Sequence, residues 1–297
     1  MIEKIYVFGT SFAEGGGFEF NINKTISYSY NGLGEEYTKE NFSFPGQLRK
    51  LLPNIEIVNL SKSGYGNERM YRLASDIVFS DNFDVDNSLL IFDFSHLGRK
   101  EYFSRKLNKH IILNYDANSN PISLNGVAQE YLKTHEEYEK DIENLPLLDL
   151  DNSNFFNEWV PLTYNEQVQH ELCSSNATIF LSFLKNRNVK YLFTDPPYFI
   201  NHRDYDNLLK NHYIKFQDKA STHDYHNDKT ISDETDGYHT DEHYGLIKNK
   251  LIASCIHDEL IKRNMISGSK LNKNIKDFDN IKKIITKNTN YLNKRNI

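Results

Sequence analysis

Four short apolar runs divide the chain and predict the strands of a buried sheet. They lie at residues 5–8, 55–60, 89–94 and 189–194 and are rich in β-branched and aromatic residues. Runs of this length and composition are typical of buried strands. Because helical patterns separate the runs, the chain is predicted to form βαβ units with a mostly parallel sheet, in an α/β fold.

Apolar residues at helical spacing predict the helices between and after these strands. A short helix over residues 44–52 opens with Ser-Phe-Pro, and Pro45 suits its first turn. Three longer helices are predicted from apolar stripes with a period near 3.6 residues. The stripes are Met70, Leu73, Ala74, Ile77 and Val78; Val168, Leu172, Ile179 and Phe183; and Ile247, Leu251, Ile252, Cys255, Ile256 and Leu260.

Two segments interrupt this regular pattern. Residues 99–161 are polar and rich in tyrosine and asparagine, with one predicted helix near 127–143. Long segments without regular structure usually serve a function in compact domains, so we interpret 99–161 as an insertion that caps the candidate site of a domain spanning 1–265. The basic tail, residues 266–297, has apolar residues at helical spacing. We expect the tail to dock on the acidic body or on a sister subunit, and the second case would make a homo-oligomer. The alternatives are docking on an anionic surface and a tail without a stable helix.

Composition and charge narrow the functional classes. The chain has 297 residues, a formal net charge of −6 and two cysteines, Cys173 and Cys255. The negative charge argues against a surface that binds nucleic acid, and the two cysteines imply no disulfide framework. No apolar run approaches the ~18 residues of a membrane span, and no signal-peptide pattern precedes the first strand. We therefore expect a cytoplasmic protein without a membrane span.

Ser11 is the candidate nucleophile, because it follows the first apolar run directly after Gly9 and Thr10. The carboxyl end of a parallel strand is where open α/β sheets bind their ligands. A serine needs a base to take its proton, and that base works best when a carboxylate fixes its tautomer. Asp236 and His239, separated by two residues, can supply both groups. Backbone N–H groups at Ser11 and Gly64 can bind an oxyanion, since glycine permits a close approach.

These stretches resemble, in order, the sequence blocks of the SGNH (GDSL-like) hydrolases. Gly9-Thr10-Ser11-Phe12 looks like the Gly-Asp-Ser block, and Asn59 through Gly64 looks like the second block. Pro196-Pro197 and Asp236-x-x-His239 are similar to the later ones, and the resemblance spans residues 4 to about 262.

The resemblance implies a fold and an activity. The fold would be a three-layer α/β/α sandwich around a doubly wound, flavodoxin-like sheet. The activity would be hydrolysis of small acyl esters by Ser11, His239 and Asp236 without a cofactor or metal, and O-acetyl groups on carbohydrate are one candidate substrate.

The third block departs from the family pattern. Its usual Gly-x-Asn-Asp is replaced here by Ser95-His96-Leu97-Gly98-Arg99, and the place of the oxyanion-binding asparagine falls near Leu97. Loss of one such donor typically costs ~10²–10³ in rate. His96, Arg99 or Asn67 are candidates to substitute for it. The structural alternatives are an ion-pair or solvated role for Arg99 and a helix N-cap for Asn67.

Two other functions fit parts of the sequence. His239-Thr240-Asp241-Glu242-His243 spells the His-x-x-Glu-His pattern of one class of zinc peptidase, with His239 and His243 as ligands. A zinc assay on the purified protein distinguishes that reading. The second alternative is a binding or structural protein that keeps the fold without catalysis, which the altered third block favours.

Overall fold

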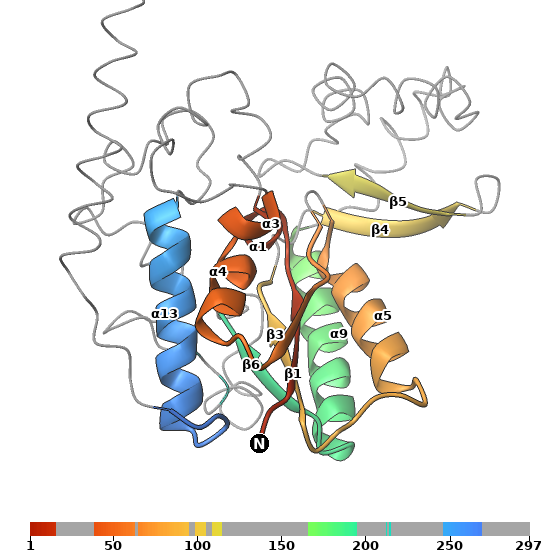
Figure 1. Ribbon diagram of the computed structural model, residues 1–297. Helices are drawn as coiled ribbons and strands as arrows, with labels where there is room; N and C mark the ends of the chain where they lie inside the picture. The colour runs from red at the N-terminus through yellow and green to blue at the C-terminus, as the bar shows by residue number, and fades with distance from the viewer. Residues whose placement is uncertain are drawn as a thin grey trace, which may run out of the picture.

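A computed structural model of the protein describes residues 1–15, 39–62, 65–94, 99–104, 109–114, 166–194, 212, 214 and 246–268. Its centre is a four-stranded sheet with the order β2-β1-β3-β6, in which all neighbouring strands are parallel (Figure 1). The strands are β1 (Lys4–Phe8), β2 (Glu56–Asn59), β3 (Ser88–Phe92) and β6 (Lys190–Phe193). The four predicted strands are therefore confirmed, with their ends moved by one or two residues.

Helices cover both faces of this sheet. On one face α4 (Phe44–Leu51) and α13 (Leu246–Lys262) pack over a cluster that includes Ile5, Val7 and Ile91. On the other face α5 (Asn67–Val78) and α9 (Glu166–Asn186) pack over Phe8, Phe92 and their neighbours (Figure 1). The predicted three-layer α/β/α sandwich is confirmed. The side chains of successive strand residues alternate between the two clusters, as expected for strands buried on both faces.

A fifth segment extends the sheet beyond β6. The N–H of Phe193 donates to the carbonyl of His212 at 2.8 Å, and the N–H of Ile214 donates to the carbonyl of Phe193 at 2.9 Å. In a parallel pair of strands, one residue bonds to two residues of the neighbouring strand that are two positions apart. The segment therefore runs in the same direction as β6, which gives the strand order of the flavodoxin-like fold.

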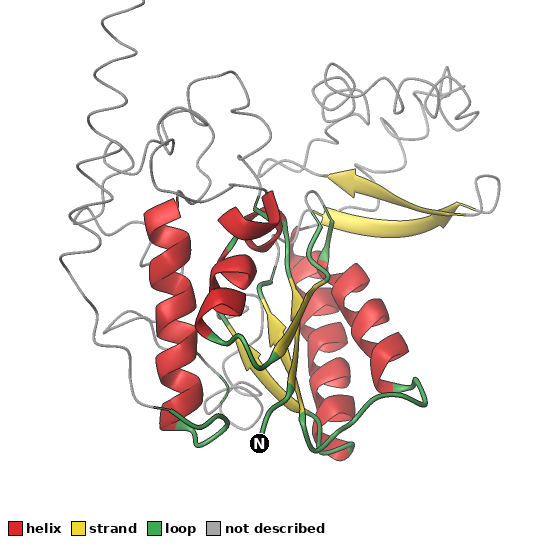
Figure 2. Cartoon of the chain, viewed as in Figure 1, coloured by secondary structure: helices red, strands yellow, loops and turns green. Residues whose placement is uncertain are grey.

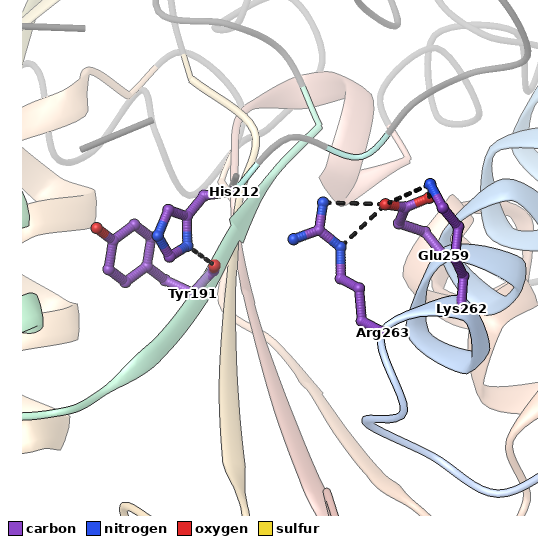
Figure 3. A network of polar contacts seen from close by, with 5 residues as sticks. All are labelled: Tyr191, His212, Glu259, Lys262 and Arg263. Atoms are coloured by element: carbon purple, nitrogen blue, oxygen red, sulfur yellow. Dashed lines mark hydrogen bonds and ion pairs between the residues drawn. The ribbon is translucent and has the colours of Figure 1, made fainter. Parts of the chain in front are cut away.

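The end of α13 lies at the amino edge of the sheet. The N–H of Ile2, just before β1, donates to the carbonyl of Met265 at 2.9 Å. Near that end, Arg263 and Lys262 pair with the buried carboxylate of Glu259 (Figure 3). Because α13 ends at the amino edge, its first residue, Leu246, lies towards the carboxyl edge.

Protonation of His212 is expected to destabilise the fold. Its ring stacks on Tyr191 with the centroids 4.1 Å apart, and its Nδ1–H donates to the Tyr191 carbonyl at 2.9 Å (Figure 3). Burial lowers the pKa of His212 below its ordinary value of 6.5, with smaller contributions from the charges of Arg263 and Lys185, although the bond to Tyr191 opposes the change. Below that ordinary value the unfolded chain binds more protons than the folded protein, so stability falls as the pH falls.

The measurement is the urea midpoint between about pH 7.5 and about pH 5, for the wild type and for His212→Asn. The asparagine amide can replace the Nδ1–H donor but does not titrate, so its midpoint should fall less over this range. An equal fall in both proteins would contradict the assignment.

Two predictions about helices are wrong in detail. The apolar stripe that predicts α9 includes Leu172 and Ile179, but these two residues are 49% and 69% exposed and do not mark its buried face. The buried face of α9 instead carries Cys173, Ala177, Phe180, Leu181 and Leu184. Asn67 is not the N-cap of α5, because Gly66 holds that position in an extended conformation and Asn67 is the first helical residue.

A hairpin inside the proposed insertion was not predicted. Strands β4 (Arg99–Ser104) and β5 (Lys109–Asn114) pair antiparallel as a separate two-stranded sheet (Figure 2). Strand β4 contacts α5, and the hairpin lies at the end of the molecule opposite the labelled N-terminus (Figure 1). The predicted helix near 127–143 and the tail beyond Gly268 lie outside the described residues. None of the helices in the described ranges is both long and apolar enough to cross a membrane.

Candidate active site

Ser11 lies where the chain leaves β1, an interior strand, at the carboxyl edge of the sheet. Strand β1 ends at Phe8, and Ser11 is the first residue of the four-residue helix α1 (Ser11–Glu14). Gly15 ends this helix with a φ of 91°, and its N–H donates to the Ser11 carbonyl at 3.0 Å. Ser11 is 7% exposed, and its side chain makes no hydrogen bond with another residue of the described ranges.

The topology makes this edge the expected position of a ligand-binding site. From β1 the chain continues to β2 on one side, whereas from β3 it continues to β6 on the other side. The point between β1 and β3 is therefore the topological switch point, and open α/β sheets bind ligands in the crevice there. Ser11 follows the first of these two strands and Asp93 follows the second.

Gly9 allows the backbone before Ser11 to approach its neighbours closely. A Cβ at this position would lie 2.6 Å from Ala13 Cβ, 2.9 Å from Asp93 Cβ and 3.1 Å from Ser61 Oγ. Separations under about 3 Å are not tolerated in close-packed interiors. Helix α1, the end of β3 and the chain after β2 therefore converge on Gly9 because it carries no side chain.

Asn59, the last residue of β2, holds helix α1 in place. Its Nδ2 donates to the Ala13 carbonyl at 2.9 Å, and its Oδ1 accepts from the Ser61 N–H at 3.1 Å. The Lys62 N–H donates to the Gly9 carbonyl at 3.0 Å, so the end of β2 and the chain directly after it bond to the backbone on both sides of Ser11.

Replacing Asn59 by alanine should destabilise the protein by roughly 1–3 kcal/mol, since the Ala13 carbonyl and the Ser61 N–H would lose their partner. Any activity that depends on Ser11 should fall as well. Urea denaturation measures the first effect, and Asn59→Asp is the comparison variant because it keeps the acceptor for the Ser61 N–H but places a charged oxygen against the Ala13 carbonyl. An alanine variant as stable as the wild type would contradict the anchoring role.

A buried polar row continues across the sheet from Gly9. Asp93, directly after β3, is 3% exposed, and its Oδ1 accepts from Thr194 Oγ1 at 2.6 Å. Thr194, directly after β6, is fully buried. Ser61 lies on the other side of Gly9, and its buried Oγ has no hydrogen-bond partner in the described part of the chain. By strand alternation all of these side chains lie on the face covered by α1, α4 and α13.

Only Asp93 among these residues has a recognisable signal in the sequence. Asp93 is the one charged residue of the apolar run 89–94, and a carboxylate in such a run is rarely buried without a partner. Thr194 and Ser61 carry no comparable signal, because each is an ordinary residue at the end of a strand.

Of the other predicted site residues, Asn67 is the best described. It is buried at the start of α5, and α5 follows the carboxyl end of β2. Arg99 is the first residue of β4, and the position of its side chain is not described. Gly64, His96, Asp236 and His239 lie outside the described residues.

Within the described ranges, no group of three or more His, Cys, Asp or Glu side chains is placed to hold a metal ion. The two histidines of the zinc alternative, His239 and His243, lie outside those ranges. The zinc reading therefore rests on the sequence pattern alone.

Comparisons with known proteins do not assign a family. No family model and no curated protein matches the chain. One similar solved structure is the crystal structure of LAE5, an alpha/beta hydrolase enzyme from the metagenome of Lake Arreo, Spain. It is 12% identical, covers 90% of this chain and 97% of its own, and has a TM-score of 0.38.

Proposed function

We propose that the protein is a serine hydrolase that cleaves small acyl esters. Ser11 is the nucleophile, His239 the general base and Asp236 the group that orients the histidine. The observation that carries the proposal is the position of Ser11, which is the first residue of α1 at the switch point of a doubly wound sheet. A ligand bound in that crevice would reach the serine directly.

The chemistry follows from these roles. His239 takes the proton of Ser11 as its oxygen attacks the ester carbonyl, and the negative charge moves to the carbonyl oxygen. Backbone N–H groups of Ser11 and Gly64 stabilise that oxyanion. The alcohol leaves with the proton held by His239, and a water molecule activated by the same histidine then releases the acid and frees Ser11.

The connection that contains Asp236 and His239 supports their assignment. It starts after Ile214, beyond the carboxyl end of β6, and it ends at Leu246, the first residue of α13. Both ends therefore lie on the edge that carries Ser11. His239 is seven residues before Leu246, so it cannot lie more than roughly 25 Å from the start of that helix.

Asn67, His96 and Arg99 are our candidates for the oxyanion donor that the third block lacks. Asn67 has the most support, because it is buried where α5 begins beside the carboxyl end of β2. We further propose that segment 99–161 covers the cleft and sets the size of the substrate. The contact between β4 and α5 supports this, since the first residues of α5 lie on the same edge as Ser11.

Turnover of 4-nitrophenyl acetate, together with labelling by a fluorophosphonate probe, tests the proposal. The expected result is turnover together with probe attached to the peptide that contains Ser11. Acetylated carbohydrates can then be compared with simple acetates to define the alcohol. If the protein shows no turnover and the probe does not label Ser11, the non-catalytic alternative becomes the better explanation.

A further inference from the structure

A side-chain hydrogen bond joins the ends of two strands beneath the proposed catalytic serine. The Thr194 hydroxyl donates to Asp93 Oδ1 at 2.6 Å, and the two residues directly follow β6 and β3. This length is at the short end of the ordinary range for O–H···O hydrogen bonds, about 2.5–3.0 Å.

Asp93 also packs against the backbone of Phe8 and Gly9, which leads to Ser11. The Asp93 N–H donates to the Phe8 carbonyl at 2.8 Å, which continues the pairing of β1 with β3 by one residue. Asp93 Cβ lies 2.9 Å from the place where a Cβ on Gly9 would be. Since the two backbones are already in contact, a sideways shift of Asp93 must move Gly9, and Ser11 is two residues further along.

On the β6 side, Thr194 is held as firmly as Asp93. Its side chain is fully buried, and its N–H donates to the Phe92 carbonyl at 3.0 Å. A buried carboxylate is retained at a cost, because an apolar pair of similar volume would often be as stable or more so. A polar pair at this position is therefore better explained by the single geometry that it imposes than by stability.

We propose that Asp93 and Thr194 form a buried clamp that positions Ser11, acting through Gly9 and helix α1. This inference rests on the proposed function, because it assigns the clamp a part in that reaction. Asp93 and Thr194 are positioning residues and do not touch the substrate. A misplacement of the reacting atoms by ~1 Å can cost on the order of 10²-fold in rate. Loss of the clamp should therefore lower kcat and leave KM nearly unchanged.

Three variants test the clamp. Thr194→Val removes the hydroxyl with almost no change in volume, Thr194→Ser restores a hydroxyl, and Asp93→Asn keeps an acceptor at Oδ1. The sites that react with the fluorophosphonate probe are counted in each preparation, so that kcat refers to folded, reactive protein. We expect kcat to fall by about 10- to 100-fold in Thr194→Val, with KM within about twofold. The kcat of Thr194→Ser should lie within about threefold of the wild-type value. The kcat of Asp93→Asn should lie between those of Thr194→Ser and Thr194→Val.

The outcomes separate the clamp from the proposed function. Turnover by the wild type together with an unchanged kcat in Thr194→Val would overturn the clamp alone. A lower melting temperature with unchanged kcat per reactive site would also overturn it, because that pattern indicates a purely structural pair. Equal losses in Thr194→Ser and Thr194→Val would overturn it as well, since the hydroxyl would not matter. If the wild type shows no turnover that depends on Ser11, the proposed function and the clamp fail together.

Discussion

Replacing Ser11 by alanine is expected to lower ester turnover by at least about 10⁴-fold and to leave the fold intact. Removal of a catalytic serine deletes the covalent step, and in serine hydrolases such losses reach ~10⁶ in kcat. The fold should survive, because alanine is tolerated at the first position of a helix and the Ser11 hydroxyl bonds to no other described residue. The measurement is kcat for 4-nitrophenyl acetate, with circular dichroism and the melting temperature as checks on folding.

Ser61→Ala is the matched control for this experiment. Ser61 is a second buried serine at the same edge, and its Oγ has no hydrogen-bond partner in the described ranges. Its removal should change neither turnover nor stability by much, because no bond is lost. His239→Ala should lose activity to the same degree as Ser11→Ala, since both act in one step. A Ser11→Ala protein that keeps a tenth of the wild-type rate would refute the assignment of the nucleophile.

Replacing Gly9 by alanine is expected to destabilise the protein by roughly 3 kcal/mol or more, and it is the largest effect on stability that we predict. The new Cβ would lie 2.6 Å from Ala13 Cβ and 2.9 Å from Asp93 Cβ. Neither neighbour is the far end of a flexible side chain, so relief requires backbone movement of α1 or β3. In a chain of this size, 1 kcal/mol corresponds to about 2–4 °C in the melting temperature. Thermal and urea unfolding measure the change directly.

A double-mutant cycle with Ala13→Gly separates the contact from other effects. Ala13→Gly alone should cost about 0.5–1 kcal/mol, because glycine weakens helix α1. In the double variant the contact at 2.6 Å is absent while the contact with Asp93 remains. Its destabilisation should therefore be smaller than the sum of the two single values. Simple additivity, or a stable Gly9→Ala protein, would show that the backbones do not meet as described.

The layer structure followed from the sequence because it depends on local patterns. Each of the four apolar runs forms a strand, since a short run of β-branched and aromatic residues is typical of a strand that is buried on both faces of a parallel sheet. The buried face of α9 could not be predicted from the sequence in the same way. Its apolar residues lie on two sides of the helix, and Leu172 and Ile179 fall on the side that faces solvent. Only packing against Phe92 and Tyr71 decides which side is buried.

The hairpin β4–β5 likewise could not be predicted from its local sequence. Its strands mix charged and apolar residues, and an isolated hairpin is at best marginally stable in water. The contact of β4 with α5 supplies what the local sequence lacks.

The candidate site was predictable where one residue type carries the chemistry. Ser11 could be proposed because a serine after a strand and a glycine has a chemical meaning by itself. Asp93 and Thr194 have a recognisable role only because of the register of the sheet, which pairs Phe8 with Phe92 and Phe92 with Phe193. Asn59 likewise matters because it reaches the Ala13 carbonyl, 46 positions away in the chain. Contacts at such separations are set by the tertiary structure, and a one-residue change of register would remove them.

The strand order also has a consequence for synthesis of the chain on the ribosome. Strands β1, β2 and β3 all lie within the first 92 residues, so these three can pair early. The other edge of β3 must wait for β6, which is made roughly a hundred residues later, or about 5–20 s at typical rates of translation. During that interval the buried strand Ser88–Phe92 exposes an unpaired edge and Asp93 lacks its threonine. Nascent chains stalled between β3 and β6 should therefore be the form most prone to aggregate and most in need of a chaperone.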